Sequence, residues 1–168
     1  MGRRILSAQK APAGRFPSSK FNFIWVSNEK FALKAESCGV DAIVAEGFEA
    51  GGHNGREETT TLVLIPQICK AVKIPVIAAG GIGTGKTMLA AVALGAEGVQ
   101  IGSRFVTSEE SSAHINFKKA VLKAKDGDTQ LSIKKLTPAR LLKNKFWEQI
   151  NRAEMSGASE EELKIILG

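Results

Sequence analysis

The chain has 168 residues, of which 43% are hydrophobic and 24% charged, and its formal net charge is +6 at pH 7. This is ordinary globular composition for one domain, and it excludes a membrane protein, because no apolar run approaches the roughly 18 residues that a membrane span needs. Two cysteines without C-x-x-C spacing and two histidines favour neither a disulfide framework nor a metal site. We therefore expect a soluble protein of the reducing cytoplasm, without metal ligands.

Two basic segments do not predict a nucleic-acid partner. Residues 1 to 20 carry five basic and no acidic side chains, but they lack helical periodicity, and Pro12 and Pro17 interrupt them. We expect a disordered basic leader there. The second basic run, from Lys118 to Lys145, has no aromatic side chains between its charges on which bases could stack. It is more typical of solvated helix faces.

Four short apolar runs alternate with helical segments between residues 21 and 103. The runs are apolar through their length and bounded by Gly or Pro, as strands buried on both faces are. We expect strands at 21–27, 41–47, 74–81 and 96–103. Helices are expected at 29–38, 62–72 and 84–94, provided that Pro66 lies in the first turn of the second one. The alternation predicts an α/β fold with a parallel sheet, whose functional residues lie after the carboxyl ends of the strands.

The pattern changes from Ser112 onward, where it predicts helices alone. They are expected near 112–125, around 138–151 and at 156–168, and Ser159 with Glu162 makes a capping box in the last of them. No separate domain is indicated, so residues 21–168 are expected to form one domain that includes tail helices in 112–168. These helices would pack on the layer of strands and helices before them.

The stretch GGIGTGKT, at residues 80 to 87, matches the phosphate loop of nucleotide hydrolases. That chemistry needs a second acidic residue for magnesium at the end of a neighbouring strand. The run AEGVQIGS ends in none, and Glu46 ends another strand inside a glycine-rich loop. A nucleotide hydrolase is therefore not favoured.

The same glycines have a second interpretation. Gly80 and Gly81 directly follow one expected strand, and Gly102 with Ser103 repeats the arrangement after the next. Glycines there let backbone N–H groups approach an anion. Two such loops after consecutive strands are typical of the phosphate site of a (β/α)8 barrel, built after strands seven and eight.

Three motifs in order carry a specific resemblance: VDAIVAEGFEAGGHNG, IPVIAAGGI and GAEGVQIGSRF. They resemble the flavin-dependent nitronate monooxygenases, formerly called 2-nitropropane dioxygenases, and the related flavin-type enoyl-acyl-carrier-protein reductases. The resemblance covers roughly residues 21–168 and implies a (β/α)8 TIM barrel that holds FMN. If FNFIWVS is strand five, the chain holds strands five to eight of a barrel that needs about 250 residues. It then looks like the C-terminal half of the barrel.

The resemblance also implies the site residues. His53, in the A-G-G-H-x-G loop, would be the catalytic base or acid beside the flavin, since a histidine can take a proton from the carbon next to a nitro group. His114 is expected at the surface, whereas Glu57 and Glu58 are expected to cap and start the next helix, with Glu57 also able to orient the loop. The implied FMN-binding residues are Glu46 (often Gln in the family), Gly51, Gly80, Gly81, Gln100, Ile101, Gly102 and Ser103 (often Thr in the family).

The implied reaction is oxidative. A nitroalkane or its nitronate binds over the flavin, His53 assists proton removal, the flavin takes an electron, and O2 completes the conversion to a carbonyl compound and nitrite. Two alternatives stay open: an FMN-dependent enoyl-acyl-carrier-protein reductase that uses NAD(P)H, and a non-catalytic remnant. An open half-barrel further predicts that the isolated chain is either a homodimer in which two halves close one barrel, or poorly soluble. A missing N-terminal half is the other possible partner.

Overall fold

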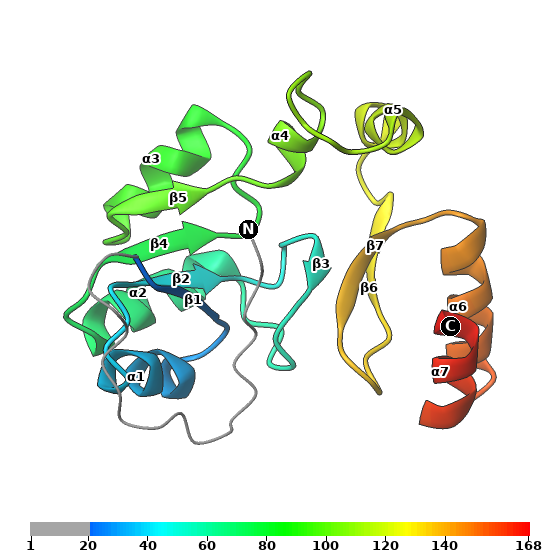
Figure 1. Ribbon diagram of the computed structural model, residues 1–168, viewed down its shortest axis with the longest axis horizontal. Helices are drawn as coiled ribbons and strands as arrows, with labels where there is room; N and C mark the ends of the chain where they lie inside the picture. Colours follow the sequence, from blue (N-terminus) through cyan, green and yellow to red (C-terminus); the bar gives the residue numbers. More distant parts are fainter. Residues whose placement is uncertain (1–20) are drawn as a thin grey trace. The chain divides into compact units, whose positions relative to one another are not determined.

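The computed structural model describes residues 21–168, which divide into two compact units (Figure 1). The first unit comprises residues 21–49 and 57–101, and the second comprises residues 50–56 and 102–168. The basic leader expected at residues 1–20 lies outside the described residues. In the part of the chain that is described, no helix is both long and apolar enough to cross a membrane.

The first unit is built around a parallel sheet. Its strands are β1 (Phe23–Val26), β2 (Ala42–Glu46), β4 (Val76–Ala79) and β5 (Gly98–Gln100), and its helices are α1 (Glu29–Ser37), α2 (Thr61–Ala71) and α3 (Gly85–Ala93). The strand order is β1-β2-β4-β5, so strands that follow one another along the chain of this unit also lie side by side. A doubly wound sheet reverses its order at a switch point, whereas a barrel does not. The order is therefore that of a barrel segment, as the sequence predicts.

The two faces of this sheet differ because side chains alternate along each strand. One face packs against the helices and forms the core, with Ile43 of β2 and Ile65 and Ile68 of α2 fully buried. The register places the remaining side chains, among them Trp25, Val44, Ile77, Glu46 and Gln100, on the opposite face. In a closed barrel this second face is the interior.

Helix α2 contains Pro66 as its sixth residue, so the expected first-turn position is wrong. A proline at this point removes the N–H that would bond to the carbonyl oxygen of Leu62. The side chain of Leu62 is 65% exposed, so this turn lies on the solvent side of α2. Water can hydrogen-bond a carbonyl oxygen there, which is why the helix tolerates the proline.

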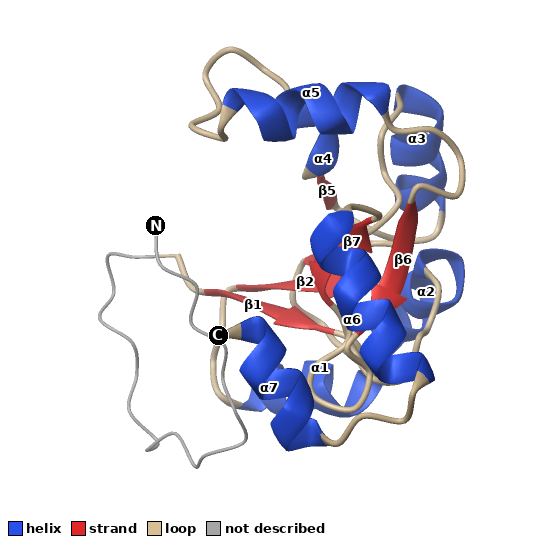
Figure 2. Ribbon diagram, turned by 90° about the vertical axis from the view of Figure 1, so that its right-hand side faces the viewer, coloured by secondary structure: helices blue, strands red, loops and turns tan. Residues whose placement is uncertain are grey.

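The second unit contains a three-stranded antiparallel sheet and four helices (Figure 2). Its strands are β3 (Gly52–His53), β6 (Thr129–Ser132) and β7 (Ala139–Leu142), in the order β3-β7-β6. Its helices are α4 (Ser103–Val106), α5 (Ile115–Lys123), α6 (Lys145–Met155) and α7 (Glu160–Leu167). A small core of Ile133, Ala139 and Ile150, with Leu136, Leu141 and Ile166 packed around it, holds the hairpin against α6 and α7.

The prediction of helices alone after Ser112 is therefore wrong. Residues 129–132 and 139–142 are strands, and the helix expected around 138–151 begins only at Lys145. Asn144 is its N-cap and accepts a hydrogen bond from Trp147 N at 2.8 Å, which fixes the start of α6. The capping box of Ser159 and Glu162 at the start of α7 is confirmed.

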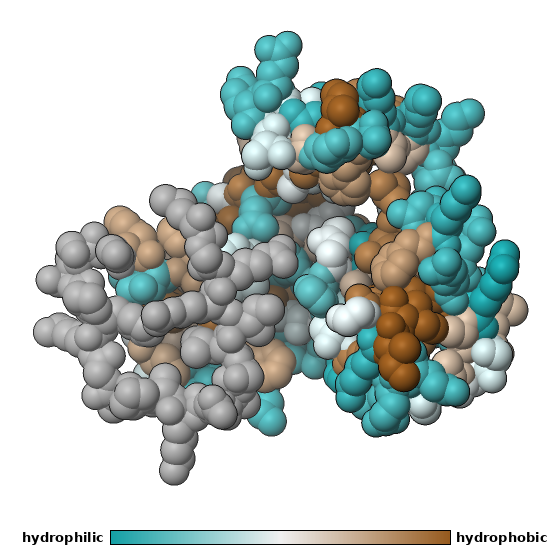
Figure 3. Space-filling model, turned by 45° about the vertical axis from the view of Figure 1, so that its right-hand side comes forward, coloured by the Kyte–Doolittle hydropathy of each residue, from teal (hydrophilic) through white to brown (hydrophobic). Residues whose placement is uncertain are grey.

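Large apolar side chains reach the surface in both units. In the first unit they include Trp25, which is 42% exposed, and Leu89 of α3 at 68%. In the second they include Ile165 and Met155, at 80% and 81%. Figure 3 shows such apolar side chains, in brown, at the surface among hydrophilic ones.

Candidate functional site

The predicted site residues fall into two groups, one in each unit. Those of the first unit are Glu46, Gly80, Gly81, Gln100 and Ile101, and those of the second are Gly51, His53, Gly102 and Ser103. Within each unit the structure brings its members together. The prediction that the two glycine loops hold one phosphate joins residues of both units and stays a prediction.

Glu46 and Gln100 lie in one row at the carboxyl end of the parallel sheet. Glu46 pairs with Ala79 of β4, and Ala79 pairs with Gln100 of β5. Two strand spacings separate the outer residues of the row, or about 10 Å between their Cα atoms. Both side chains lie on the face without helices. Ile101, in contrast, packs against the core on the helix side, so only its backbone is available to a ligand.

Trp25 of the first strand lies in the row of Val44 and Ile77 and contacts the row of Glu46 and Gln100 through its side chain. Its Nε1 donates a hydrogen bond of 3.0 Å to Oε1 of Gln100, across the two strands that separate β1 from β5. Because Oε1 accepts this bond, the Nε2 group of Gln100 remains as a donor for a ligand. The sequence interpretation missed Trp25, although strand alternation puts it on the same face as Gln100.

A tight cluster surrounds Gly80 at the ends of β2 and β4. Thr61 N donates to the two carboxylate oxygens of Glu49 at 3.2 and 3.0 Å, and Thr61 Oγ1 donates to Glu49 Oε2 at 2.9 Å. Glu49 thereby caps α2, whose N-cap residue Thr60 makes no side-chain cap bond. A Cβ at Gly47 would lie 2.5 Å from Thr61 N, and one at Gly80 would lie 2.8 Å from Gly47 O. The backbones therefore need glycine at both positions.

The two predicted phosphate loops differ in why they contain glycine. Gly81 has φ of 65°, and a Cβ there would lie 3.3 Å from the Cβ of Glu49, so the fold itself requires glycine. Gly102 has φ of −95°, and a Cβ there would meet nothing within 4 Å. A Cβ at Gly51 would lie 3.7 Å from Ser103 Oγ, so the Gly51 backbone borders the Ser103 hydroxyl. Gly102 therefore has no steric need for glycine, in contrast to Gly81.

His53 stands on an ordered backbone with its side chain exposed. It pairs with Ala139 in the antiparallel sheet, and the next residue, Asn54, donates from its backbone N to Pro138 O at 2.8 Å. Asn54 Nδ2 also donates to Ala50 O at 2.9 Å and to Gly52 O at 3.0 Å, which closes the loop around His53. The loop is therefore a rigid support that presents the imidazole, and Asn54 is a supporting residue that the sequence interpretation missed.

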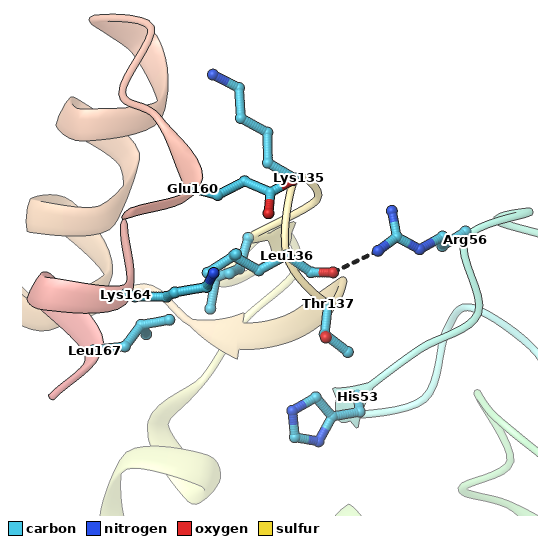
Figure 4. Close-up of a pocket in the computed structure, with 9 residues that line it drawn as sticks. His53, Arg56, Lys135, Leu136, Thr137, Glu160, Lys164 and Leu167 are labelled. Atoms are coloured by element: carbon cyan, nitrogen blue, oxygen red, sulfur yellow. Dashed lines mark hydrogen bonds between the residues drawn. The ribbon is translucent and has the colours of Figure 1, made fainter. Parts of the chain in front are cut away.

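A pocket of about 400 Å³ borders His53 within the second unit. Figure 4 shows that its walls come from His53 and Arg56, from the loop between β6 and β7, and from α7. Arg56 Nη2 donates to Leu136 O at 2.6 Å and so joins two of these walls. The sequence did not predict this pocket, because its walls are distant along the chain.

Three other expectations concern residues outside this pocket. Glu57 and Glu58 do not cap α2, whose N-cap is Thr60, so that expectation is wrong. Glu57 instead accepts hydrogen bonds from Asn28 Nδ2 at 2.7 Å and Ser27 Oγ at 3.3 Å, which ties its loop to the start of α1. His114 is exposed, as expected, and caps α5 by accepting from Asn116 N.

The phosphate-loop motif serves as a helix cap in this structure. Thr84 and Thr87 form a capping box, and Thr87 Oγ1 accepts from Thr84 N at 3.0 Å and donates to Thr84 O at 2.8 Å. In nucleotide hydrolases the corresponding hydroxyl binds magnesium. Among the described residues, no group of three or more His, Cys, Asp or Glu side chains could hold a metal ion.

Burial raises the pKa of the Cys69 thiol, which makes it a poor nucleophile.

Comparisons with known proteins agree with this arrangement. The nitronate monooxygenase family matches residues 18–165. A probable nitronate monooxygenase of Staphylococcus saprophyticus is 41% identical over an alignment of 130 residues, and the match covers 71% of this chain and 37% of the relative. One of Staphylococcus aureus is 43% identical over an alignment of 134 residues, and the match covers 73% of this chain and 37% of the relative.

Two solved structures give the same picture. FabK from Thermotoga maritima superposes with a TM-score of 0.78 at 43% identity, covering 84% of this chain and 45% of FabK. Nitroalkane oxidase from Streptomyces ansochromogenes superposes with a TM-score of 0.68 at 34% identity, covering 76% of this chain and 40% of the oxidase. These neighbours are TIM-barrel enzymes, so the predicted partial barrel is confirmed. The chain spans less than half the length of these relatives, and it belongs to the nitronate monooxygenase family.

Proposed function

We propose that residues 21–168 are the FMN-binding part of an oxidoreductase that converts nitronates or nitroalkanes with O2. The observation that carries this proposal is the row of Glu46 and Gln100 at the carboxyl edge of a barrel-type sheet, in a chain of the nitronate monooxygenase family. Ligands of (β/α)8 barrels bind at that edge. The parts of such an enzyme that lie beyond this chain's match to its relatives would supply the rest of the site.

The residues of this chain have separate tasks in the proposed site. Gln100 donates from Nε2 to an acceptor atom of the cofactor, since its Oε1 accepts from Trp25. The bare backbone of Gly51 and Gly102 and the hydroxyl of Ser103 receive the phosphate. Gly80, Gly81 and Ile101 of the first unit are further proposed contacts of the cofactor, and Ile101 contributes only its backbone. A bound flavin would supply the redox chemistry, while the protein supplies position and electrostatics.

His53 is the proposed base for neutral nitroalkanes. The hydrogen bonds of Asn54 hold the backbone of the loop that carries His53, and the imidazole is exposed. The ring is therefore accessible to a substrate. It takes the proton from the carbon next to the nitro group, which leaves a nitronate with charge on the nitro oxygens. A preformed nitronate needs no such step.

Visible spectroscopy on the purified chain tests this proposal, followed by titration with FMN and with riboflavin. We expect the chain to bind FMN more tightly than riboflavin, because the glycine loops bind the phosphate. Oxygen consumption with a nitroalkane and with its nitronate then tests the reaction. Turnover of an enoyl thioester with NAD(P)H instead would assign the reductase function, and a chain without flavin affinity would be a non-catalytic remnant.

A further inference from the structure

The pocket beside His53 contains cationic side chains that the proposed function does not use. Arg56 follows β3, Lys164 belongs to α7, and the two approach Leu136 from opposite sides in Figure 4. Lys135 is also cationic, but its Nζ donates to Ala158 O at 2.6 Å and to Gly157 O at 3.2 Å. Arg56 and Lys164 are therefore the cations that can act on a ligand in the pocket.

Neither side chain forms an ion pair within residues 21–168. The partner of Arg56 is the neutral carbonyl oxygen of Leu136, which uses one of its five N–H groups. Within residues 21–168, Lys164 Nζ has no hydrogen bond or ion pair. Glu160 is the single carboxylate of the lining, and it lies one helical turn before Lys164. An anion placed between Arg56 and Lys164 would gain charge-assisted hydrogen bonds from both sides.

The loop between β6 and β7 makes a firm wall for such a ligand. Ile133 begins it with φ of 60°, a conformation that β-branched residues rarely adopt, and its side chain is only 7% exposed. Packing against Ala139 and Ile150 holds it there. Leu136 N donates to Ile133 O at 3.1 Å, and Lys134 N donates to Glu154 Oε1 at 3.3 Å. Backbone strain that is held in this way is common at ligand sites.

The pocket also has an apolar side. Leu136 and Leu167 line it, with Ile133 behind them, and its volume of about 400 Å³ suits a small metabolite. A ligand that satisfies both sides has one ionised group and a short apolar part. If water alone filled the pocket, the apolar side chains of Leu136 and Leu167 would stay in contact with solvent.

We propose that this pocket binds a small organic anion, with its carboxylate or phosphate between Arg56 and Lys164 and its apolar part on Leu136 and Leu167. The bound anion lies beside His53, because the imidazole belongs to the same lining. The lining contains none of the glycines proposed to bind the FMN phosphate. It goes beyond the proposed function and does not depend on flavin binding.

The two histidines of the chain provide a direct test by NMR. Their imidazole C–H signals are followed while phosphate, acetate or butyrate is added at constant ionic strength and pH. We expect saturable shifts of the His53 signals and unchanged signals of His114, which lies exposed at the cap of α5. Butyrate should bind more tightly than acetate because it also covers the leucines.

Variants decide whether the named cations are responsible. Lys164→Gln and Arg56→Gln should each weaken binding about tenfold, the scale of one charge-assisted hydrogen bond at a partly exposed site. Lys123→Gln, on the exposed side of α5, is the matched control and should change nothing. Unchanged amide spectra confirm that each variant folds. Equal drift of both histidines, or full affinity in both pocket variants, would overturn the proposal.

The source of the anion is resolved by adding FMN and riboflavin to the same samples. If FMN displaces butyrate and Lys164→Gln lowers the affinity for FMN, the pocket holds the phosphate of the cofactor. If FMN binds without displacing butyrate, the anion is a separate small molecule. A chain that binds butyrate but no flavin would leave this inference standing and remove the proposed function.

Discussion

Replacing Gly102 by Ala separates a glycine required for ligand binding from one required for the fold. The φ of −95° is open to any residue, and an added Cβ would meet no atom within 4 Å. Substitution should therefore leave the free energy of unfolding within about 1 kcal/mol of the parent, or raise it slightly, because alanine restricts the unfolded chain. Gly81→Val cannot separate the two roles, because it would also disturb the fold. Valine disfavours the φ of 65° at this position, and its Cβ would crowd the side chain of Glu49.

The expected cost to FMN binding follows from the lost contact. A methyl group at Gly102 would hold the phosphate away from the backbone and remove one hydrogen bond to a charged group, which contributes about 1.5–3 kcal/mol. The dissociation constant for FMN should then rise roughly tenfold to a hundredfold. Riboflavin has no phosphate, so its affinity should stay the same.

The assay is a pair of fluorescence titrations, with FMN and with riboflavin, on the parent and on Gly102→Ala. Gly98→Ala is the control. Gly98 belongs to β5, and its added Cβ would make an ordinary contact of 3.8 Å with Ile77 Cγ1 of the neighbouring strand β4. Urea denaturation of all three proteins measures the stability. Equal losses for FMN and riboflavin, or no loss for FMN, would refute the assignment of Gly102 to the phosphate.

Four other outcomes are expected. His53→Asn should keep FMN affinity but lower turnover of a neutral nitroalkane about 100-fold, and turnover of the nitronate less; equal losses on both substrates in oxygen-consumption assays would make His53 a positioning residue. Trp25→Phe should weaken FMN binding about fivefold, the worth of one hydrogen bond near 1 kcal/mol, and an additional effect in the Gln100→Leu background, which has no acceptor for the indole N–H, would contradict the link between them. Gly47→Ala should lower the free energy of unfolding by about 2 kcal/mol or more in urea denaturation, since its Cβ overlaps Thr61, and a stable variant would disprove the cluster at the ends of β2 and β4. Light scattering should give a dimer mass, and a monodisperse particle of 17.9 kDa at high concentration would reject closure of one barrel by two chains.

The parallel sheet could be predicted from the sequence because its signals are local. Each strand is a short apolar run, α1 and α3 begin at the capping residues Asn28 and Thr84, and the order of the strands follows the chain. The hairpin of β6 and β7 carries no such signal. Its pairing with β3 joins residues far apart along the chain, and the cap at Asn144 alone marks where the next helix starts. Tertiary pairing therefore overrode the helical pattern expected there.

The candidate site was predicted unevenly for the same reason. Glu46, His53 and the glycines lie in motifs that follow strands, so their neighbourhood could be expected. Trp25, Glu49 and Arg56 act through partners 75, 12 and 80 residues away, and no local spacing indicates these contacts. Motifs thus locate the edge of the sheet at which we propose that a ligand binds, while the side chains that support this edge are identified only in the folded structure.

The pairing of β3 with β7 has a consequence for the order of events during synthesis. The hydrogen bond from Arg56 to Leu136 O connects the histidine loop, residues 50–56, to the hairpin of β6 and β7, and these two residues are 80 positions apart. The ribosome releases the loop well before its partner strand, whereas β1 and β2 can pair as soon as both emerge. Closing so long a loop is slow compared with local pairing. The histidine loop should therefore be the last part of its unit to become protected from hydrogen exchange during refolding, after the sheet of the first unit is already formed.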